Sequence, residues 1–235
     1  AAGKKVGMIG TVEIDDGAEV RPAEMTTPGA VELVELFARM RGNGVEYCVM
    51  EVSSHALHQQ RTAGIEFAVG IFTNLTGDHL DYHKTMEEYA AAKALLFEGL
   101  GAEGVSILNI DDAFCSRMEQ NCAARVIHYG AAVGAKSPAT SYLAQSRRVS
   151  PERVRLLISA PGGAAKFELV TPLIGKHNAY NILSVVAACE AMGIDRETVI
   201  ESLGTSRGAP GRLQRVEGSA EFQVFVDYAH THDSL

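Results

Sequence analysis

The sequence lacks any long apolar segment. Its 235 residues are 46% hydrophobic, yet no window approaches the ~20 consecutive apolar residues that a membrane-spanning helix needs. The first ten residues, AAGKKVGMIG, carry Lys4 and Lys5 but only a short apolar run, with no small-residue cleavage site after it. We therefore expect neither export nor membrane insertion.

Paired cysteines are lacking as well. The four cysteines, at positions 48, 115, 122 and 189, show no CxxC spacing, and Cys48 and Cys189 lie within apolar runs that are typical of a protein core. This usage indicates a reducing compartment, so we expect a cytoplasmic protein.

Positive charge is scarce. Lys and Arg number 21 against 29 Asp and Glu, which gives a net charge of -8. Such a balance argues against a general nucleic-acid or membrane-binding surface. Any site for a phosphate group must therefore be local, or be helped by a metal ion.

Short apolar runs rich in β-formers alternate with helical patterns in the first 130 residues. The hydrophobicity of these runs is continuous rather than alternating, which predicts strands buried on both faces of a mostly parallel sheet flanked by helices, an α/β fold. Amphipathic helices are predicted over 29–40 and 85–100. The predicted strands are 6–12, 47–52, 69–73, 105–110 and 125–129.

The second half of the sequence predicts a different organisation. Residues 131–148 are rich in Ala, Ser and Gly without a clear period, and residues 154–159 and 166–171 flank the turn APGGA, which predicts an antiparallel β hairpin and so a small antiparallel β subdomain. Helices are predicted over 178–192 and 196–203, the latter with Asp195 as N-cap. We expect one domain over 1–208 and the start of a second over 209–235.

The stretch TNLTGDHLDYH, residues 73–83, follows a predicted strand and places Asp78, His79, Asp81 and His83 within six residues. Ligands of open α/β sheets bind beyond the carboxyl ends of the strands, so these groups are candidates for a metal or substrate site. The alternative is a polar loop whose histidines only cap and hydrogen-bond.

The stretch MEVSSHALHQQR, residues 50–61, follows another predicted strand. Glu51 stands at the carboxyl end of that strand, where a carboxylate can hold Mg²⁺, although an ion pair at the sheet end is the alternative. For Ser53, Ser54 and His55 the alternative is N-capping of the next helix. A serine hydrolase is disfavoured because SSH lacks the GxSxG pattern.

Four further motifs are ambiguous by themselves. Lys93, in YAAAKALLF, either takes part in a site or extends from an amphipathic helix to solvent. The run HNAYN at 177–181 indicates either helix capping or recognition of a nucleotide base. PGR at 210–212 and DYAHT at 227–231 offer an Arg and an Asp/His pair for a ligand at a domain junction, or surface ion pairs.

Taken in order, these stretches resemble the Mur ligases over nearly the whole chain, and within that family the MurE type. The motifs that carry the resemblance are KVGMIGTV, TTPGA at 26–30, MEVSSHAL, TNLTGDHLDYH, the AK ending at Lys93, HNAYN, PGR and VDYAHT. The resemblance implies a monomeric enzyme that uses ATP and Mg²⁺ to add a third amino acid, meso-diaminopimelate or lysine, to UDP-N-acetylmuramoyl-L-alanyl-D-glutamate through an acyl phosphate, in peptidoglycan biosynthesis.

The resemblance also implies roles for single residues. Glu51, His79 and Lys93 would be catalytic and hold Mg²⁺, Lys93 as a carbamate that supplies oxygen ligands. Arg61 is suited to a carboxylate by its two-pronged donor geometry. The implied substrate contacts are Thr26, Thr27, Ser53, Gln59 and Arg61, and the implied ATP contacts are Asn178, Asn181, Arg212, Asp227 and His230.

The chain departs from the family pattern at three points. Met25 stands where the family has Asn before the paired threonines, and His232 stands where Pro is usual. No GxxxxGK[ST] phosphate-binding loop is present, so the phosphates of ATP lack their backbone N–H cradle and lysine. We expect the chain by itself to be a truncated, inactive and marginally stable catalytic domain with an exposed sheet edge.

Three other functions remain open from the sequence. The first is a related amide ligase that extends folate with glutamate, which TTPGA and SSHAL disfavour. The second is a metal-dependent hydrolase built on Asp78, His79, Asp81 and His83, and the third is a non-catalytic module that binds the UDP-muramyl ligand.

Overall fold

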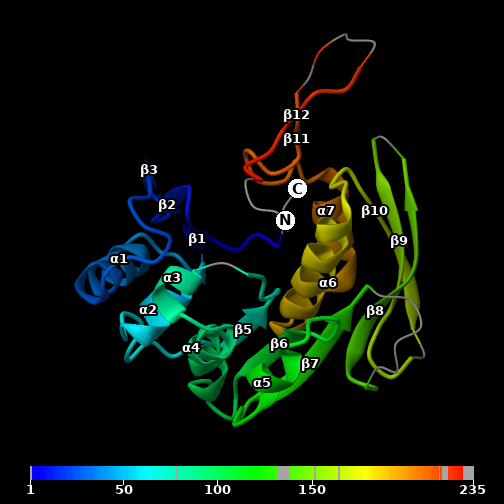
Figure 1. The fold of residues 1–235 in the computed structure, drawn as a ribbon. Helices are drawn as coiled ribbons and strands as arrows, with labels where there is room; N and C mark the ends of the chain where they lie inside the picture. The colour runs from blue at the N-terminus through cyan, green and yellow to red at the C-terminus, as the bar shows by residue number, and fades with distance from the viewer. Residues whose placement is uncertain are drawn as a thin grey trace. The chain divides into compact units, whose positions relative to one another are not determined.

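The computed structural model describes residues 2–77, 79–131, 138–150, 152–163, 165–216, 218 and 222–229. The chain divides into two compact units, which we describe separately (Figure 1). The first unit comprises Ala1–Gly70, His79–Gly104 and Arg117–Ala124, and the second comprises Ile71–Asp78, Val105–Ser116 and Arg125–Leu235.

The first unit is built on a four-stranded sheet in the order β3-β2-β1-β4. Strands β1 and β4 are parallel, with Val6 opposite Tyr47 and Ile9 opposite Met50, while β1–β2 and β2–β3 are antiparallel. The elements of this unit are β1 Val6–Ile9, β2 Glu13–Asp15, β3 Val20–Pro22, α1 Ala30–Gly42, β4 Tyr47–Met50, α2 Ser54–His58, α3 Leu80–His83 and α4 Met86–Glu98.

Helix α1 covers one face of this sheet because its apolar residues recur at helical spacing. Leu33, Leu36 and Met40 lie on the buried face of α1 and form one core cluster with Ile9 and Ile14 of the sheet. Gly7 makes this close packing possible, since a Cβ at position 7 would lie 2.9 Å from the Met40 Sδ.

The second unit contains a six-stranded sheet in the order β10-β9-β8-β7-β6-β5. The pairs β6–β7 and β7–β8 are parallel, whereas β8–β9 and β9–β10 are antiparallel. The elements are β5 Val69–Phe72, β6 Val105–Asn109, α5 Cys115–Glu119, β7 Arg125–Gly130, β8 Ser141–Val149, β9 Val154–Ser159, β10 Lys166–Thr171, α6 Lys176–Ala191, α7 Arg196–Thr205, β11 Gln214–Arg215 and β12 Phe225–Val226.

Helix α6 packs against the centre of this sheet, on β6, β7 and β8 (Figure 1). Its buried residues include Ile182, Leu183, Val186 and Ala187, and all five residues of β6 are buried. Helix α7 packs against β10. The short ribbon of β11 and β12 pairs Gln214 with Val226.

The expected α/β class, with parallel strands flanked by helices and an antiparallel part, is confirmed. The antiparallel part continues the parallel strands through β8 instead of forming a separate sheet. Thr85 and Asp195 cap α4 and α7 with side chains that accept hydrogen bonds from backbone N–H groups. None of the helices in the described ranges is long and apolar enough to cross a membrane.

Three local expectations were wrong. Residues 141–149 form strand β8 where no periodicity predicted one, because β7 and β9 pair with it on both sides. The predicted strand over 6–12 ends at Ile9, and the chain turns back into β2. Cys48 is exposed rather than in the core, since β4 is the edge strand of its sheet.

Candidate functional site

Glu51 follows β4 directly, and two threonines hold it from neighbouring segments. The Thr11 hydroxyl, just beyond β1, donates to the Glu51 Oε2. The Thr27 hydroxyl donates to the Glu51 backbone oxygen at 2.8 Å. Because β1 and β4 are parallel neighbours, their carboxyl ends place Thr11 beside Glu51 although 40 residues separate them.

Thr26 and Thr27 occupy different environments in the loop before α1. Thr26 is half-buried, and its Oγ1 lies 3.1 Å from the Thr11 Oγ1. Thr27 is 1% exposed, and its Oγ1 also accepts the Ser53 N–H at 2.9 Å. The Thr27 hydroxyl therefore bonds to the backbone of both Glu51 and Ser53.

Ser53 starts α2 as its N-cap, because its side chain accepts the Ala56 N–H at 3.2 Å. N-capping, the alternative that the sequence left open beside a substrate contact, is therefore observed for Ser53. It fixes the direction in which the chain leaves Glu51, and it leaves the Ser53 hydroxyl proton available to a ligand.

Arg61 is held in place by Gln59 and by the loop before α1. Its Nε and Nη2 donate to the Gln59 Oε1 at 2.9 and 2.6 Å, and its Nη1 donates to the Thr27 backbone oxygen at 2.9 Å. The Nη1 also lies 3.6 Å from the Met25 Sδ, a weak acceptor. An incoming carboxylate can replace that thioether contact, so Met25 does not block the guanidinium.

Tyr82 of α3 connects to the same segment. Its hydroxyl lies 2.8 Å from the His58 Nδ1 and accepts from the Gln59 Nε2 at 3.3 Å. A continuous set of hydrogen bonds therefore runs from Tyr82 through Gln59 and Arg61 to Thr27.

Tyr89 of α4 brings His79 and Lys93 together. The His79 ring lies edge-on to the Tyr89 ring, with centroids 5.8 Å apart, and the Lys93 Nζ lies 5.2 Å from the centre of the same ring. His79 has a left-handed backbone, with φ of 56°, directly before α3. Such a conformation is rare for a residue with a side chain and recurs at functional sites.

His83 is buried and is used within the protein. Its Nε2 lies 2.8 Å from the Ser54 Oγ, and its ring stacks on Tyr89. Burial, and secondarily the neighbouring His55, lower the pKa of His83 below 6.5. Within the described ranges, which omit Asp78, no group of three or more His, Cys, Asp or Glu residues is arranged to hold a metal ion.

The expected nucleotide-side residues lie in the second unit. Asn178 does not cap α6, which begins two residues earlier at Lys176. Instead its Nδ2 donates to the Ile174 backbone oxygen at 2.6 Å and its Oδ1 accepts from Asn181 at 3.3 Å. Asn181 is exposed.

Asp227 and Arg212 flank the ribbon of β11 and β12, Arg212 before β11 and Asp227 directly after β12. The Asp227 carboxylate accepts the Leu213 and Ala229 N–H groups, each at 2.6 Å, and these bonds lower the pKa of Asp227. Arg212 lies 5.4 Å from the centre of the Tyr228 ring. His230 lies outside the described residues.

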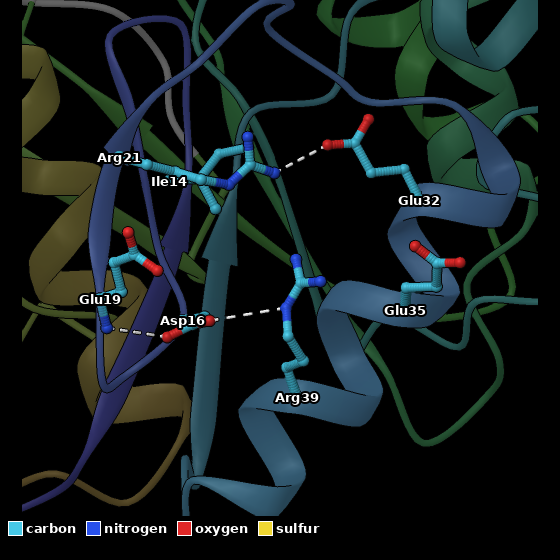
Figure 2. Close-up of a pocket in the computed structure, with 7 residues that line it drawn as sticks. All are labelled: Ile14, Asp16, Glu19, Arg21, Glu32, Glu35 and Arg39. Carbon is cyan, nitrogen blue, oxygen red and sulfur yellow. Dashed lines mark hydrogen bonds and ion pairs between the residues drawn. The ribbon is translucent and has the colours of Figure 1, made fainter.

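A half-open groove of about 470 Å³ lies between the β2–β3 hairpin and α1 (Figure 2). Arg21 pairs with Glu32 at 2.8 Å and Arg39 pairs with Asp16 at 3.6 Å. Each guanidinium therefore bridges the two elements, as the dashed lines in Figure 2 show. None of the candidate site residues lines this groove.

Glu51, His79, Lys93 and the expected substrate contacts therefore all belong to the first unit, and Asn178, Asn181, Arg212 and Asp227 belong to the second. The sequence reasoning missed Thr11, Tyr82 and Tyr89, which hold these groups in place. Thr11 and Tyr82 do lie inside the motifs KVGMIGTV and TNLTGDHLDYH, so their position beside polar site residues was a usable signal.

Residues 1–189 match the family model of the Mur ligase middle domain. The chain belongs to the Mur ligase family. This Mur ligase chain is 42% identical over 239 residues to the UDP-N-acetylmuramoyl-L-alanyl-D-glutamate--2,6-diaminopimelate ligase of Geobacillus kaustophilus, with 99% of this chain and 47% of that protein covered. It is 41% identical over 230 residues to the enzyme of the same name from Gloeobacter violaceus, with 97% and 45% covered.

Solved structures agree with this family. A structure of a UDP-N-acetylmuramoyl-L-alanyl-D-glutamate--2,6-diaminopimelate ligase matches with a TM-score of 0.80 and 28% identity, covering 98% of this chain and 46% of that one. MurF from Acinetobacter baumannii matches with a TM-score of 0.69 and 19% identity over 88% of this chain and 45% of that one, which shows the shared Mur ligase fold alone. The chain spans about half the length of the curated relatives it matches.

Proposed function

We propose that the protein containing this chain is an ATP-dependent ligase that joins 2,6-diaminopimelate to UDP-N-acetylmuramoyl-L-alanyl-D-glutamate as the third amino acid, in peptidoglycan biosynthesis. One observation carries the proposal. Relatives named for this activity are 41–42% identical to the chain over 97% or more of its length. The enzyme acts as a cytoplasmic monomer.

The residues of the first unit fit the Mg²⁺ that the family implies. The Glu51 carboxylate is exposed at the carboxyl end of β4, and Lys93 as a carbamate adds oxygen ligands, the type that Mg²⁺ prefers. His79, at the start of α3, would be the third ligand. When bound, Mg²⁺ supplies charge neutralisation at the phosphates during phosphoryl transfer.

The substrate contacts position the carboxylate that reacts. Beyond its bonds to Gln59 and Thr27, Arg61 has one further N–H on Nη2 and one on Nη1, which also lies near the Met25 Sδ. These two N–H groups suit a bidentate bond to a substrate carboxylate. Thr26, Ser53 and Gln59 add neutral hydrogen-bonding groups. Thr27, being buried, contributes by holding the loop that carries Thr26.

The reaction has two balanced steps. The substrate glutamate carboxylate attacks the γ-phosphorus of ATP, the bond to the β-phosphate oxygen breaks, and an acyl phosphate and ADP result. The amine of diaminopimelate then attacks the acyl carbon, phosphate leaves, and the amine loses a proton as the amide forms. Both steps depend on holding the reacting atoms in contact range.

The nucleotide is bound by the second unit. We propose that Asn178 and Asn181 contact the adenine, and that Arg212, Asp227 and His230 approach ATP from a second domain. This second domain begins within 209–235, after a middle domain over 1–208. The proposal is supported by the exposed amide of Asn181 at the first turns of α6.

Phosphate release by the full-length protein tests this function. Release that requires ATP, Mg²⁺, UDP-N-acetylmuramoyl-L-alanyl-D-glutamate and diaminopimelate together, and that is lost in Lys93→Ala, is the expected result. Lys4→Ala serves as the matched control, since Lys4 is an exposed lysine paired with Glu46.

Other outcomes would redirect the proposal. Phosphate release with lysine in place of diaminopimelate would mean that the enzyme is still a ligase but adds lysine. If the protein binds the UDP precursor but releases no phosphate with either amino acid, it is a binding module and not a ligase.

A further inference from the structure

Thr11 makes the one hydrogen bond to the Glu51 side chain that the described structure records. Its hydroxyl has a single proton, and that proton is directed at the Glu51 Oε2. The Thr26 Oγ1, 3.1 Å away, is then the donor to the Thr11 oxygen. The result is a directed chain of hydroxyls, from Thr26 through Thr11 to the carboxylate, in which each bond polarises the next.

Gly10 lies beside the other carboxylate oxygen of the exposed Glu51. A Cβ at position 10 would come to 3.4 Å from the Glu51 Oε1, a close contact that glycine avoids. The Glu51 N–H donates to the Ile9 oxygen at 2.8 Å, and Thr27 holds the Glu51 backbone oxygen. The backbone of Glu51 is therefore fixed from both sides, and Thr11 fixes the end of its flexible side chain.

We propose that Thr11 is a positioning residue that orients the Glu51 carboxylate toward a divalent cation. This inference rests on the proposed role of Glu51 as a Mg²⁺ ligand. A glutamate side chain rotates about three bonds, and each rotamer points its oxygens differently. Hydrogen bonds to ligating carboxylates hold the productive orientation, and their removal typically lowers metal affinity or activity by about 10- to 100-fold.

A merely structural role for Thr11 predicts different behaviour. The contact joins the ends of two neighbouring strands at an exposed position, so a structural role would show as a lower melting temperature with unchanged cation affinity. The hydroxyl, not the size of the side chain, is what the positioning role requires. Valine keeps the shape of threonine without the hydroxyl, and serine keeps the hydroxyl without the methyl group.

The experiment is a Mn²⁺ titration of the full-length protein, followed by electron paramagnetic resonance, with a non-hydrolysable ATP analogue present. Thr11→Val is expected to weaken Mn²⁺ binding by about 10-fold or more. Thr11→Ser is expected to stay within about 3-fold of the unsubstituted protein. The Mg²⁺ concentration at half-maximal rate should rise in parallel in Thr11→Val, with the melting temperature unchanged.

Two further variants separate the possible failures. Thr205→Val removes an exposed threonine hydroxyl on α7, which bonds only to helix carbonyls at 3.2 Å, and should bind Mn²⁺ normally. Glu51→Gln should lose the Mn²⁺ site. If it does while Thr11→Val binds normally, the positioning role is overturned and the proposed function stands. If Glu51→Gln also binds normally, the metal role of Glu51 in the proposed function has failed.

Discussion

His83 and Tyr89 stack face to face, with ring centroids 5.0 Å apart and planes inclined by 13°. This pair ties α3 to α4, and the same histidine reaches α2 through the Ser54 hydroxyl. Tyr89 in turn contacts His79 and Lys93. Through Tyr89 the stack thus contacts His79 and Lys93, two of the proposed metal-binding residues.

Removing the Ser54 hydroxyl should destabilise the first unit. Ser54→Ala leaves the Nε2 of a buried histidine without its partner, which costs about 1–3 kcal/mol of unfolding free energy. Urea denaturation measures this change. Ser116→Ala, at an exposed serine of α5, is the control and should change stability by less than about 0.5 kcal/mol. Equal stability of the two variants would contradict the importance of the Ser54–His83 bond.

Stability should fall on mild acidification. Because burial lowers the pKa of His83 below 6.5 in the folded protein, the unfolded chain takes up this proton more readily. The stabilisation is complete above pH 6.5 and is lost as the pH falls through 6.5 toward the folded pKa. Urea unfolding between pH 5 and 8 should show the free energy of unfolding falling as the pH falls. In His83→Gln this pH dependence should be weaker. An unchanged slope in His83→Gln would assign the effect to other groups.

The link between α6 and α7 should be a second stability element. Arg196 donates from its Nε and Nη2 to the two Glu190 oxygens at 2.6 and 2.8 Å, and the Tyr142 hydroxyl donates to the same carboxylate at 2.8 Å. Glu190→Gln should lower the unfolding free energy by about 1–3 kcal/mol, since these are charge-assisted bonds to a partly buried group. Glu201→Gln, at an exposed position of α7, is the control in the same urea experiment. An equal loss of unfolding free energy in Glu190→Gln and Glu201→Gln would indicate a general effect of removing a negative charge.

Tyr82 should affect substrate binding more than chemistry. Tyr82→Phe removes the hydroxyl that contacts His58 and Gln59, and so loosens the group that holds Arg61. A hydrogen bond worth about 1 kcal/mol corresponds to about a 5-fold rise in the KM for the UDP precursor, with kcat within 2-fold. Steady-state kinetics of the full-length protein measure both constants, and Tyr47→Phe on β4 is the control. A fall in kcat at constant KM would contradict this assignment.

Much of the fold follows from short-range patterns. The apolar spacing of residues 29–40 predicted α1 close to its observed bounds, although Val31 and Val34, which contributed to that spacing, are exposed. Thr85 and Asp195 marked the starts of α4 and α7. The turn APGGA placed the β9–β10 hairpin, in which Ser159 pairs with Lys166. These features could be predicted because helix periodicity, capping and turn formation each depend on residues only a few positions apart.

For the candidate site, too, the sequence determined some features and the tertiary structure decided others. The sequence by itself determined which polar residues follow the strands, among them Glu51 and His79, and the Mur ligase motifs that contain them. Only the tertiary structure decided that Thr11 binds the Glu51 carboxylate, that Thr27 is buried and that Tyr89 joins His79 to Lys93. The physical reason is that strand pairing and helix packing bring together residues far apart in the chain, such as Thr11 and Glu51 at 40 positions. No local pattern records which side chains then meet.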